Sequence, residues 1–500
     1  MKDNKKNKII LIVTGIIIII SLCIGFTKKE FENDTFYTIK VGETIVKNGI
    51  DMIDHFSWHK LSYCYPHWLY DVMIYKIYDI FGFVGIYIST MILYIILGLL
   101  VFFINIKRTK STFISLVMTI ITTIVCGVYA TARAQLVSYI IFVLELYFIE
   151  RLLSSSKKRY MILLILLSIL LANIHAAVWP FFFILFMPYI LENVVSIIKS
   201  KVSKNKQSKI FKDTIIIKKD AGFKLLLITM IICIFTGLLT PIKDIPYTYA
   251  IRIMLGNTQE YINEHKALAL INNPFALCYI VLFFLSVSLT KVKIKLSDFV
   301  MICGLILMSL MSIRHVSFLL TLGMIELTKI ITDILSLKNK EVFDLELPWI
   351  GSLVIMVVVI ICSKFIYDNT SNKDYIDKNK YPTYALKYLQ KNYNMKEVKL
   401  YNDYDFGSYL LFKNVKVYID SRSDLYTKQF NNKYDIFDEC MTISDNYGRV
   451  FNKYKITHVL TYSSTELSKI LTVSDNFKEV YYDGAFKIFE VNSNYKEENN

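Results

Sequence analysis

Long apolar runs alternate with short polar or basic segments over roughly the first 370 residues of the chain. A helix of about 20 apolar residues crosses a bilayer, so each run is a candidate membrane span. Two of the runs, 160–173 and 298–312, are short, and either could be merged with its neighbour. The pattern predicts a polytopic α-helical membrane protein with about eleven spans, at 9–26, 83–105, 112–130, 135–150, 160–173, 176–198, 222–240, 274–290, 298–312, 316–334 and 349–367.

Lysine and arginine gather in every second connection between these runs, for example in 107–110, 151–159 and the lysine-rich loop 199–221. Basic loops face the cytoplasm, which predicts an inside N-terminus and an outside C-terminus. Because 54% of the residues are hydrophobic, the net charge of +15 is better explained by topology than by nucleic-acid binding. The apolar run 9–26 has no small-residue cleavage pattern before Lys28, so we expect a retained anchor.

Two segments outside the spans are large. Residues 27–82 form the predicted first outer loop, with a short helix that ends at Gly49 and an amphipathic surface helix that starts near Pro66. Residues 368–500 mix helices with strand-like stretches and predict a small extracytoplasmic α/β domain. We therefore divide the chain into a transmembrane domain, 1–367, and an outer domain, 368–500. The predicted strands are "EVKLYN", "VKVYID", "THVLTY", "FKEVYYD" and "FKIFEV".

Ionisable residues recur at the predicted outer ends of the spans. Such groups are costly at the membrane edge unless they face a wet or paired cavity, so their recurrence predicts one shared polar cavity. Each has a plainer alternative: a helix cap for the first acid, lipid phosphate for an arginine, a satisfied core position for a histidine. The residues are Asp34, Arg133, His175, Glu264, Arg314 and His315.

Two further groups of polar residues lie outside the spans. Asp54 and His55 in the first outer loop are candidate substrate-binding residues, and a loop hydrogen-bond network is the favoured alternative. In the C-terminal domain, Asp420 and Arg422 lie at a predicted strand end, where ligands often bind. An Asp420–Arg422 ion pair is the alternative there. The eight cysteines form no CxxC motif and no Cys/His cluster, so we predict no metal site of that kind.

The order of these pieces resembles the GT-C superfamily of membrane glycosyltransferases, which use polyprenyl-phosphate-linked sugars. More closely, the chain is similar to a bacterial branch of GT-C-like proteins with a C-terminal outer domain. The matching stretches extend over nearly the whole chain. They are "DTFYTIKVGETIVKNGIDMIDHFSW", "YPHWLYDV", "TARAQLVSY", "ANIHAAVW", "SIRHVSF" and "NDYDFGSYLLFKNVKVYIDSRSDLY".

This resemblance implies a multi-pass enzyme of the bacterial plasma membrane that serves the cell envelope. We expect an inverting transfer of a sugar from a polyprenyl-phosphate donor to a glycan, lipid or protein acceptor, without nucleic acid. Asp34 falls where the family has its catalytic acid, and a carboxylate there suits a general base. Arg133 and Arg314 suit the leaving phosphate, because the guanidinium fork matches phosphate oxygens. His175 and His315 would be supporting donors.

The sequence also departs from the family. Tyr37 and Thr38 stand where relatives often have an aromatic–histidine pair, and Glu264 is followed by His265 rather than by tryptophan. No DxD motif occurs in the early outer loops, so a divalent cation lacks support from the sequence, and no cofactor is assigned.

Two other functions were weighed. A transporter or lipid flippase would place ionisable residues at mid-span, and only Glu145 and Glu326 fit that description. The second alternative function is that of a non-enzymatic membrane protein with a ligand-binding outer domain.

Overall fold

The computed structural model describes residues 2–202, 215–256, 258–290, 292–338 and 349–492, so residues 203–214 of the predicted lysine-rich loop lie outside the described residues. The chain forms two compact units, and each is described by itself. Unit 2 joins the predicted first outer loop to the C-terminal residues, whereas the sequence grouped that loop with the spans. The functional division at residue 367 stays a prediction. Unit 1 comprises Met1–Lys28, Tyr87–Tyr247 and Ile262–Asn372, and unit 2 comprises Lys29–Ile86, Thr248–Tyr261 and Lys373–Asn500.

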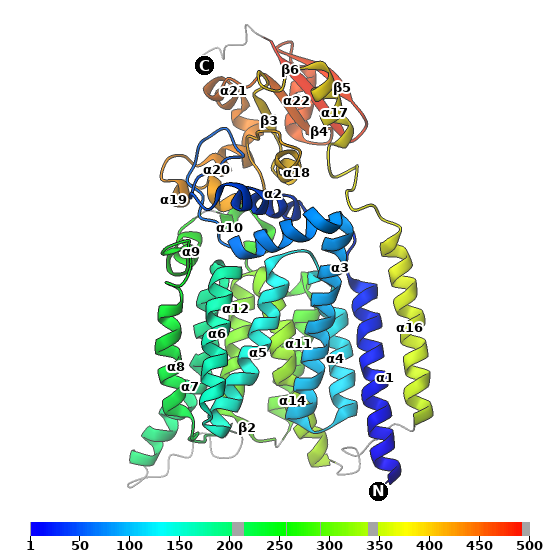
Figure 1. The fold of residues 1–500 in the computed structure, drawn as a ribbon, viewed down its shortest axis with the longest axis vertical. Coiled ribbons are helices and arrows are strands. Elements are labelled where there is room, and N and C mark those ends of the chain that lie inside the picture. The colour runs from blue at the N-terminus through cyan, green and yellow to red at the C-terminus, as the bar shows by residue number, and fades with distance from the viewer. Residues whose placement is uncertain (1, 203–214, 257, 291, 339–348, 493–500) are drawn as a thin grey trace. The chain divides into compact units, whose positions relative to one another are not determined.

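Unit 1 is a bundle of helices that coincide with the predicted apolar runs (Figure 1). Among the described residues, five helices are long and apolar enough to cross a membrane, and three shorter ones are also apolar. The helical membrane fold is confirmed, while the number and orientation of spans stay predictions. The main helices are α1 (Lys2–Phe26), α3 (Trp68–Thr109), α4 (Thr112–Cys126), α5 (Ala134–Ser155), α6 (Lys158–Ile174), α7 (Trp179–Val202), α8 (Phe223–Thr236), α11 (Pro274–Leu289), α12 (Leu296–Met311), α14 (Met324–Lys338) and α16 (Trp349–Ser371).

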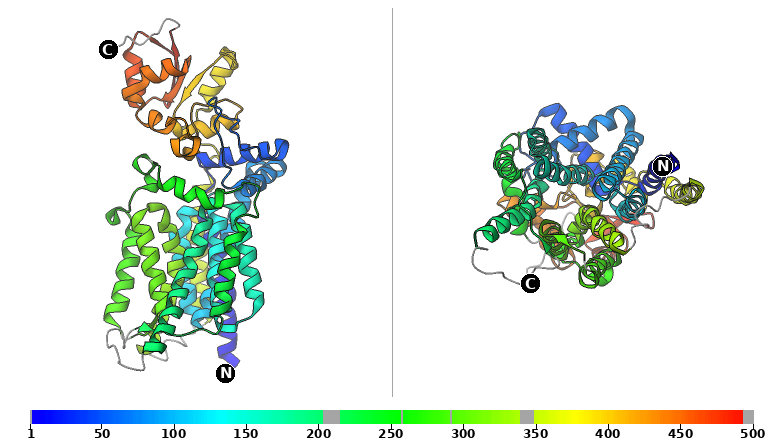
Figure 2. Two further views of the ribbon diagram at one scale, coloured as in Figure 1. Left: turned by 90° about the vertical axis from the view of Figure 1, so that its left-hand side faces the viewer. Right: turned by 90° about the horizontal axis from the view of Figure 1, so that it is seen from below.

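Helix α16 packs along α1 at the edge of this bundle, as Figures 1 and 2 both show. Close approach occurs at Gly25, where an added Cβ would lie 2.8 Å from the carbonyl oxygen of Ser363. Glycine therefore allows the first and last predicted spans to contact each other backbone to backbone.

Helix α3 is broken at Gly82, where φ is 61° and ψ is −154°. Residues with a Cβ are strained in that region, so glycine permits the break. The break separates the predicted surface helix from the predicted second span. Both predicted helices are therefore present, joined without a loop.

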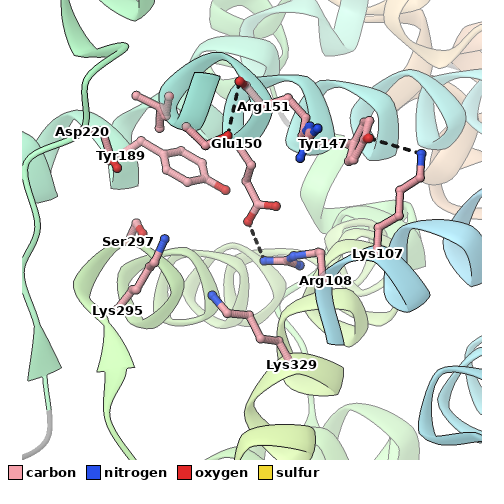
Figure 3. Close-up of a pocket in the computed structure, with 12 residues that line it drawn as sticks. Lys107, Arg108, Tyr147, Glu150, Arg151, Tyr189, Asp220, Lys295, Ser297 and Lys329 are labelled. Carbon is pink, nitrogen blue, oxygen red and sulfur yellow. Dashed lines mark hydrogen bonds and ion pairs between the residues drawn. The ribbon is translucent and has the colours of Figure 1, made fainter. Parts of the chain in front are cut away.

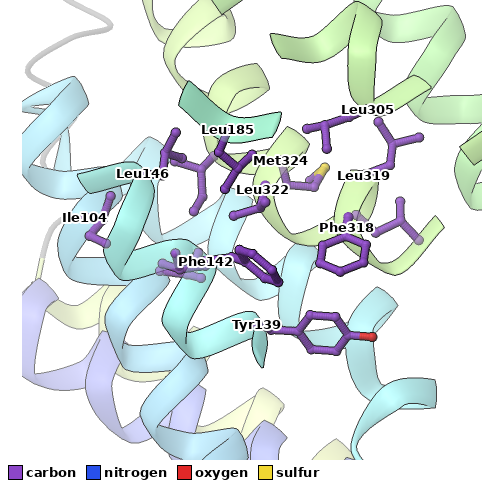
Figure 4. Close-up of a cluster of buried hydrophobic side chains, with 14 of the residues drawn as sticks. Ile104, Tyr139, Phe142, Leu146, Leu185, Leu305, Phe318, Leu319, Leu322 and Met324 are labelled. Carbon is purple, nitrogen blue, oxygen red and sulfur yellow. The ribbon is translucent and has the colours of Figure 1, made fainter. Parts of the chain in front are cut away.

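Aromatic rings from neighbouring helices pack together in the bundle, among them Phe142 and Phe318 (Figure 4). Phe318 lies 5.3 Å from Phe142 and 5.7 Å from Phe181, measured between ring centroids. These rings come from α5, α7 and the short helix α13 (Val316–Phe318). Buried aromatic pairs of this kind contribute about 0.5–1.5 kcal/mol each beyond their buried area. The connection that carries Arg314 is thereby fixed to two neighbouring helices.

Unit 2 contains the predicted α/β fold. Its sheet has the order β3-β4-β6-β5, with β3 and β4 parallel and the other pairs antiparallel. Helix α2 (Asn33–Asn48) belongs to the same unit and ends at Gly49, as predicted. The strands of this sheet are β3 (Leu400–Asn402), β4 (His458–Tyr462), β5 (Phe477–Tyr482) and β6 (Phe486–Val491), and the helices of eight or more residues described after residue 373 are α17 (Thr383–Asn392), α21 (Ile443–Tyr454) and α22 (Glu466–Val473).

The prediction of a strand at "VKVYID", residues 415–420, is wrong. Among the described residues it forms only an isolated bridge, between Val417 and Ser57. The Asn402 side chain takes the hydrogen bonds that a neighbouring strand would take: it accepts from the Tyr418 amide at 2.9 Å and donates to the Ile419 carbonyl at 2.8 Å. A side chain thus replaces the strand ladder.

A half-buried histidine makes unit 2 sensitive to acid. His59 Nε2 lies 2.8 Å from the Tyr418 carbonyl, and burial lowers the pKa of His59 to about 4. In the unfolded chain this histidine binds a proton near pH 6.5. The contribution of neutral His59 to the stability of unit 2 is therefore complete above pH 6.5 and is lost as the pH falls toward 4. Between pH 7 and pH 4.5 we expect wild type to lose about 2–3 kcal/mol more of unfolding free energy than His59→Gln. Hydrogen exchange of the β4 amides at both pH values measures this difference, and equal losses would contradict it.

Candidate functional site

The predicted site residues are divided between the two units. Asp34, Asp54 and His55 belong to unit 2, and Arg133, His175, Glu264, Arg314 and His315 belong to unit 1. The cavity that all of them would share stays a prediction, so the two groups are described one after the other.

Asp34 lies in the first turn of α2, and the N-cap residue is Glu32. The alternative in which Asp34 caps this helix is therefore wrong. The neighbouring residues fix the helix end: Asn33 donates to the Tyr404 carbonyl at 3.1 Å, and the buried Phe36 ring packs 4.9 Å from the Tyr381 ring. The half-buried carboxylate thus sits at the positive end of a helix dipole on a rigid element.

Three side chains form a hydrogen-bonded chain whose histidine interacts electrostatically with Asp34. The Tyr37 hydroxyl lies 2.9 Å from His67 Nε2, and His67 Nδ1 lies 2.7 Å from Asp71. Burial lowers the pKa of His67, but the carboxylates of Asp71 and Asp34 raise it by more, so the pKa lies above its usual value. The chain therefore places a histidine with a raised pKa within the electrostatic reach of Asp34.

Sequence reasoning missed this chain, although its members were visible. Tyr37 was noted only as a departure, because Thr38 replaces the expected histidine. In the structure His67, thirty residues later, supplies the histidine, with ring centroids 5.7 Å apart. Asp71 comes one helical turn after His67, an i,i+4 pair that could have signalled the contact.

Arg133 and Arg314 meet two consecutive residues of one loop in unit 1. Arg133 Nη1 lies 3.3 Å from Glu264, and Arg314 Nη1 lies 3.3 Å from His265 Nε2. Burial, then the Arg314 charge, lowers the pKa of His265 to about 4, so its neutral ring accepts this hydrogen bond at neutral pH. The two arginines predicted from the sequence are thereby brought to one short stretch, Glu264–His265.

The same stretch is fixed to the connection that carries Arg314. Ser312 Oγ donates to the Glu264 carbonyl at 3.0 Å, and the Ile313 amide donates to the Lys266 carbonyl at 3.0 Å. These contacts of the two residues that precede Arg314 limit the movement of its backbone. Such preorganised cations suit the binding of phosphate.

The two predicted histidines differ in surroundings. His175 is 2% exposed, and its Nδ1 lies 2.8 Å from Ser138 Oγ in α5. His315 is half-buried, with Nδ1 3.0 Å from the Met308 carbonyl and its ring 5.1 Å from Phe181. His175 thus has the contacts of a core histidine that joins two helices, while His315 stays beside Arg314.

Asp54 and His55 have separate partners. Asp54 is buried, 2.8 Å from Arg422 Nη2, and Arg422 Nη2 also lies 2.7 Å from Asp420. His55 is more exposed and lies 2.5 Å from Asp51. The predicted Asp420–Arg422 ion pair is confirmed. The arrangement around Asp54 favours the loop network over a substrate contact.

Within the described residues, one group of carboxylates is spaced for a metal ion: Glu150, Asp298 and Glu326. Each already bonds a basic side chain, since Arg108 lies 2.7 Å from both Glu150 and Glu326, and Lys329 bonds Asp298. Two cations therefore occupy the positions that a metal would take. Sequence reasoning noted Glu326 only as a charge within an apolar run.

Neither the protein-family models nor the curated proteins compared with the sequence match it. Among solved structures, the chain is similar to the crystal structure of ArnT from Cupriavidus metallidurans bound to undecaprenyl phosphate, with a TM-score of 0.51. The match covers 98% of this chain and 99% of that chain at 9% sequence identity. At this identity the likeness shows the fold alone, which is GT-C-like. The resemblance predicted from the sequence is confirmed at that level.

Proposed function

We propose that this protein is a membrane glycosyltransferase that moves a sugar from a polyprenyl-phosphate donor to an acceptor hydroxyl. The observation that carries the proposal is the shared fold over 98% of the chain with a protein bound to undecaprenyl phosphate. The acid at the start of α2 and the two arginines that contact one loop give that fold the groups such a reaction needs.

In the proposed reaction Asp34 takes the proton from the acceptor hydroxyl. The acceptor oxygen then forms a bond to the anomeric carbon, and the bond from that carbon to the phosphate oxygen breaks. The electron pair leaves with polyprenyl phosphate, and attack from the opposite face inverts the anomeric centre. Arg133 and Arg314 stabilise the charge that develops on the leaving phosphate. The proposal requires these three residues to face one cavity.

The Tyr37–His67–Asp71 chain would act through Asp34. Attraction between His67 and the Asp34 carboxylate would hold that side chain in one orientation. His67 is thus proposed as a positioning residue and Asp34 as the catalytic one.

The proposal is tested with the full-length protein in nanodiscs and a panel of polyprenyl-phosphate-linked sugars. Release of free polyprenyl phosphate, followed by chromatography and mass spectrometry, reports donor cleavage. We expect release from at least one donor that increases when an acceptor extract from the bacterial envelope is added. If every donor stays intact and none protects the protein from thermal unfolding, the proposed function is wrong.

Arg314 offers a second prediction. Replacing it by glutamine removes a charged hydrogen-bond donor to phosphate, worth about 1.5–3 kcal/mol, so the donor KM should rise roughly 10–100-fold. Arg314→Lys should restore little, because an ammonium lacks the guanidinium fork. Arg159→Gln, an exposed arginine elsewhere in unit 1, is the control. If Arg314→Gln changes neither kcat nor the donor KM, this arginine does not act at the donor site.

A further inference from the structure

A cavity of about 230 Å³ lies in unit 1, far from the arginines described above. Its walls come from α3, α5, α7, α12 and α14 and from the segment before α8 (Figure 3). Arg133 precedes the first residue of α5, and Glu150 of the cavity lies seventeen residues later, which is about 25 Å along a helix. The cavity is therefore at the opposite ends of these helices, beside the basic loops.

Positive charge dominates the lining of this cavity. Five basic side chains line it against two acidic ones, Glu150 and Asp220. Four further acids contact or lie near its residues without lining it, so the positive excess belongs to the lining itself: Glu192, Asp298, Glu326 and Asp333. The basic residues come from four different elements: Lys107, Arg108, Arg151, Lys295 and Lys329.

Arg108 is the buried centre of the lining. Its side chain is 6% exposed and its Nη2 bonds both Glu150 and Glu326. Its Nη1 is buried without a hydrogen-bond partner among the described residues. A buried donor without a partner costs about 1–3 kcal/mol, which a bound anion would offset. Figure 3 shows the Arg108 guanidinium and the Lys329 amino group pointing toward the same space.

Lys107 and Lys295 complete the lining from the exposed side. Lys107 donates to the Tyr147 hydroxyl at 3.3 Å, and both lysines are exposed. An oxyanion in the cavity would thus meet a buried guanidinium and exposed ammonium groups at the rim. This combination suits a phosphate ester, whose oxygens accept bidentate bonds from arginine.

We propose that this cavity binds a phosphate-bearing anion, as a site separate from the proposed transfer reaction. Basic pockets between membrane helices bind anionic lipid head groups, and a soluble phosphate ester offers the same chemistry. The volume admits a phosphate group with a small attached alcohol. The proposal does not depend on the proposed function.

The test compares two double variants of the full-length protein that lose the same charge. Lys107→Gln/Lys295→Gln removes two exposed lysines of the cavity, and Lys158→Gln/Lys224→Gln removes two exposed lysines at the starts of α6 and α8, outside it. Binding of short-chain phosphatidic acid is titrated in neutral detergent. We expect the cavity variant to bind roughly thirtyfold more weakly than wild type, and the control to bind within about threefold.

Competition distinguishes the two sources of phosphate. If inorganic phosphate and glycerol phosphate fail to displace the lipid, the ligand is a head group held with its chains; if they displace it, the ligand is a small phosphate ester. A second readout is acetylation of Lys295 by an amine-reactive reagent, which bound anion should slow. Equal weakening in both variants, or equal binding of zwitterionic phosphatidylcholine, would overturn the proposal.

Discussion

Replacing Asp34 by asparagine should lower the rate of sugar transfer roughly 10²–10⁴-fold, the usual cost of removing a positioned general base. The change is nearly isosteric, so α2 and its contacts through Asn33 and Phe36 should persist. The measurement is polyprenyl phosphate release by the full-length protein in nanodiscs, at saturating donor and acceptor.

The control for Asp34→Asn is Glu32→Gln. It removes one negative charge two residues away at the same end of α2, where both acids interact with the helix dipole. A fall in rate for both variants would indicate a general electrostatic effect. If Asp34→Asn raises only the acceptor KM, the residue orients the acceptor and another group is the base. Full activity of Asp34→Asn would remove this acid from the site.

Much of the membrane fold could be predicted from the sequence, because apolar runs of bilayer length leave few alternatives to helices. The α2 helix and its end at Gly49 also followed from local signals. Residues 415–420 could not be predicted as they are. Their pattern is typical of a strand, but the Asn402 side chain takes the backbone groups of Tyr418 and Ile419. Such a replacement depends on tertiary contacts that local propensity does not contain.

The candidate site, too, could be predicted from the sequence only in part. Arg133 and Arg314 were candidates because they lie at predicted outer ends of spans. In the structure they contact Glu264 and His265, respectively. His67 escaped notice because its partners come from another helix, Tyr37, and from its own next turn, Asp71. The i,i+4 spacing of His67 and Asp71 is a local signal, but no local signal indicates the contact with Tyr37. Pairing across thirty residues is decided by packing, which only a structure shows.

Replacing Arg422 by methionine should destabilise unit 2 by about 3–5 kcal/mol, because it leaves two buried carboxylates without their cation. Arg422 bonds both oxygens of Asp420 and one oxygen of Asp54, and its guanidinium lies 4.7 Å from the centroid of the Tyr63 ring. Burial raises the pKa of Asp54, but Arg422 and the hydrogen bonds from Ser57 and the Phe56 amide lower it by more, so this carboxyl stays ionised. Native-state hydrogen exchange of the β4 amides should show protection reduced roughly 10²–10⁴-fold.

Arg449→Met is the matched control, since Arg449 is exposed in the same unit and its loss should change stability by less than about 0.5 kcal/mol. A second variant separates two causes of the loss. If unpaired carboxylates dominate, Asp54→Asn in the Arg422→Met background should recover part of the protection, because it removes one buried charge while its remaining oxygen keeps one of the two bonds from the Phe56 and Ser57 amides. If the packing of the arginine between the Phe56 and Tyr63 rings dominates, the double variant should be no more stable than Arg422→Met. The difference in protection between the double variant and Arg422→Met therefore shows whether the unpaired charge of Asp54 or the lost packing of the arginine causes the loss of stability.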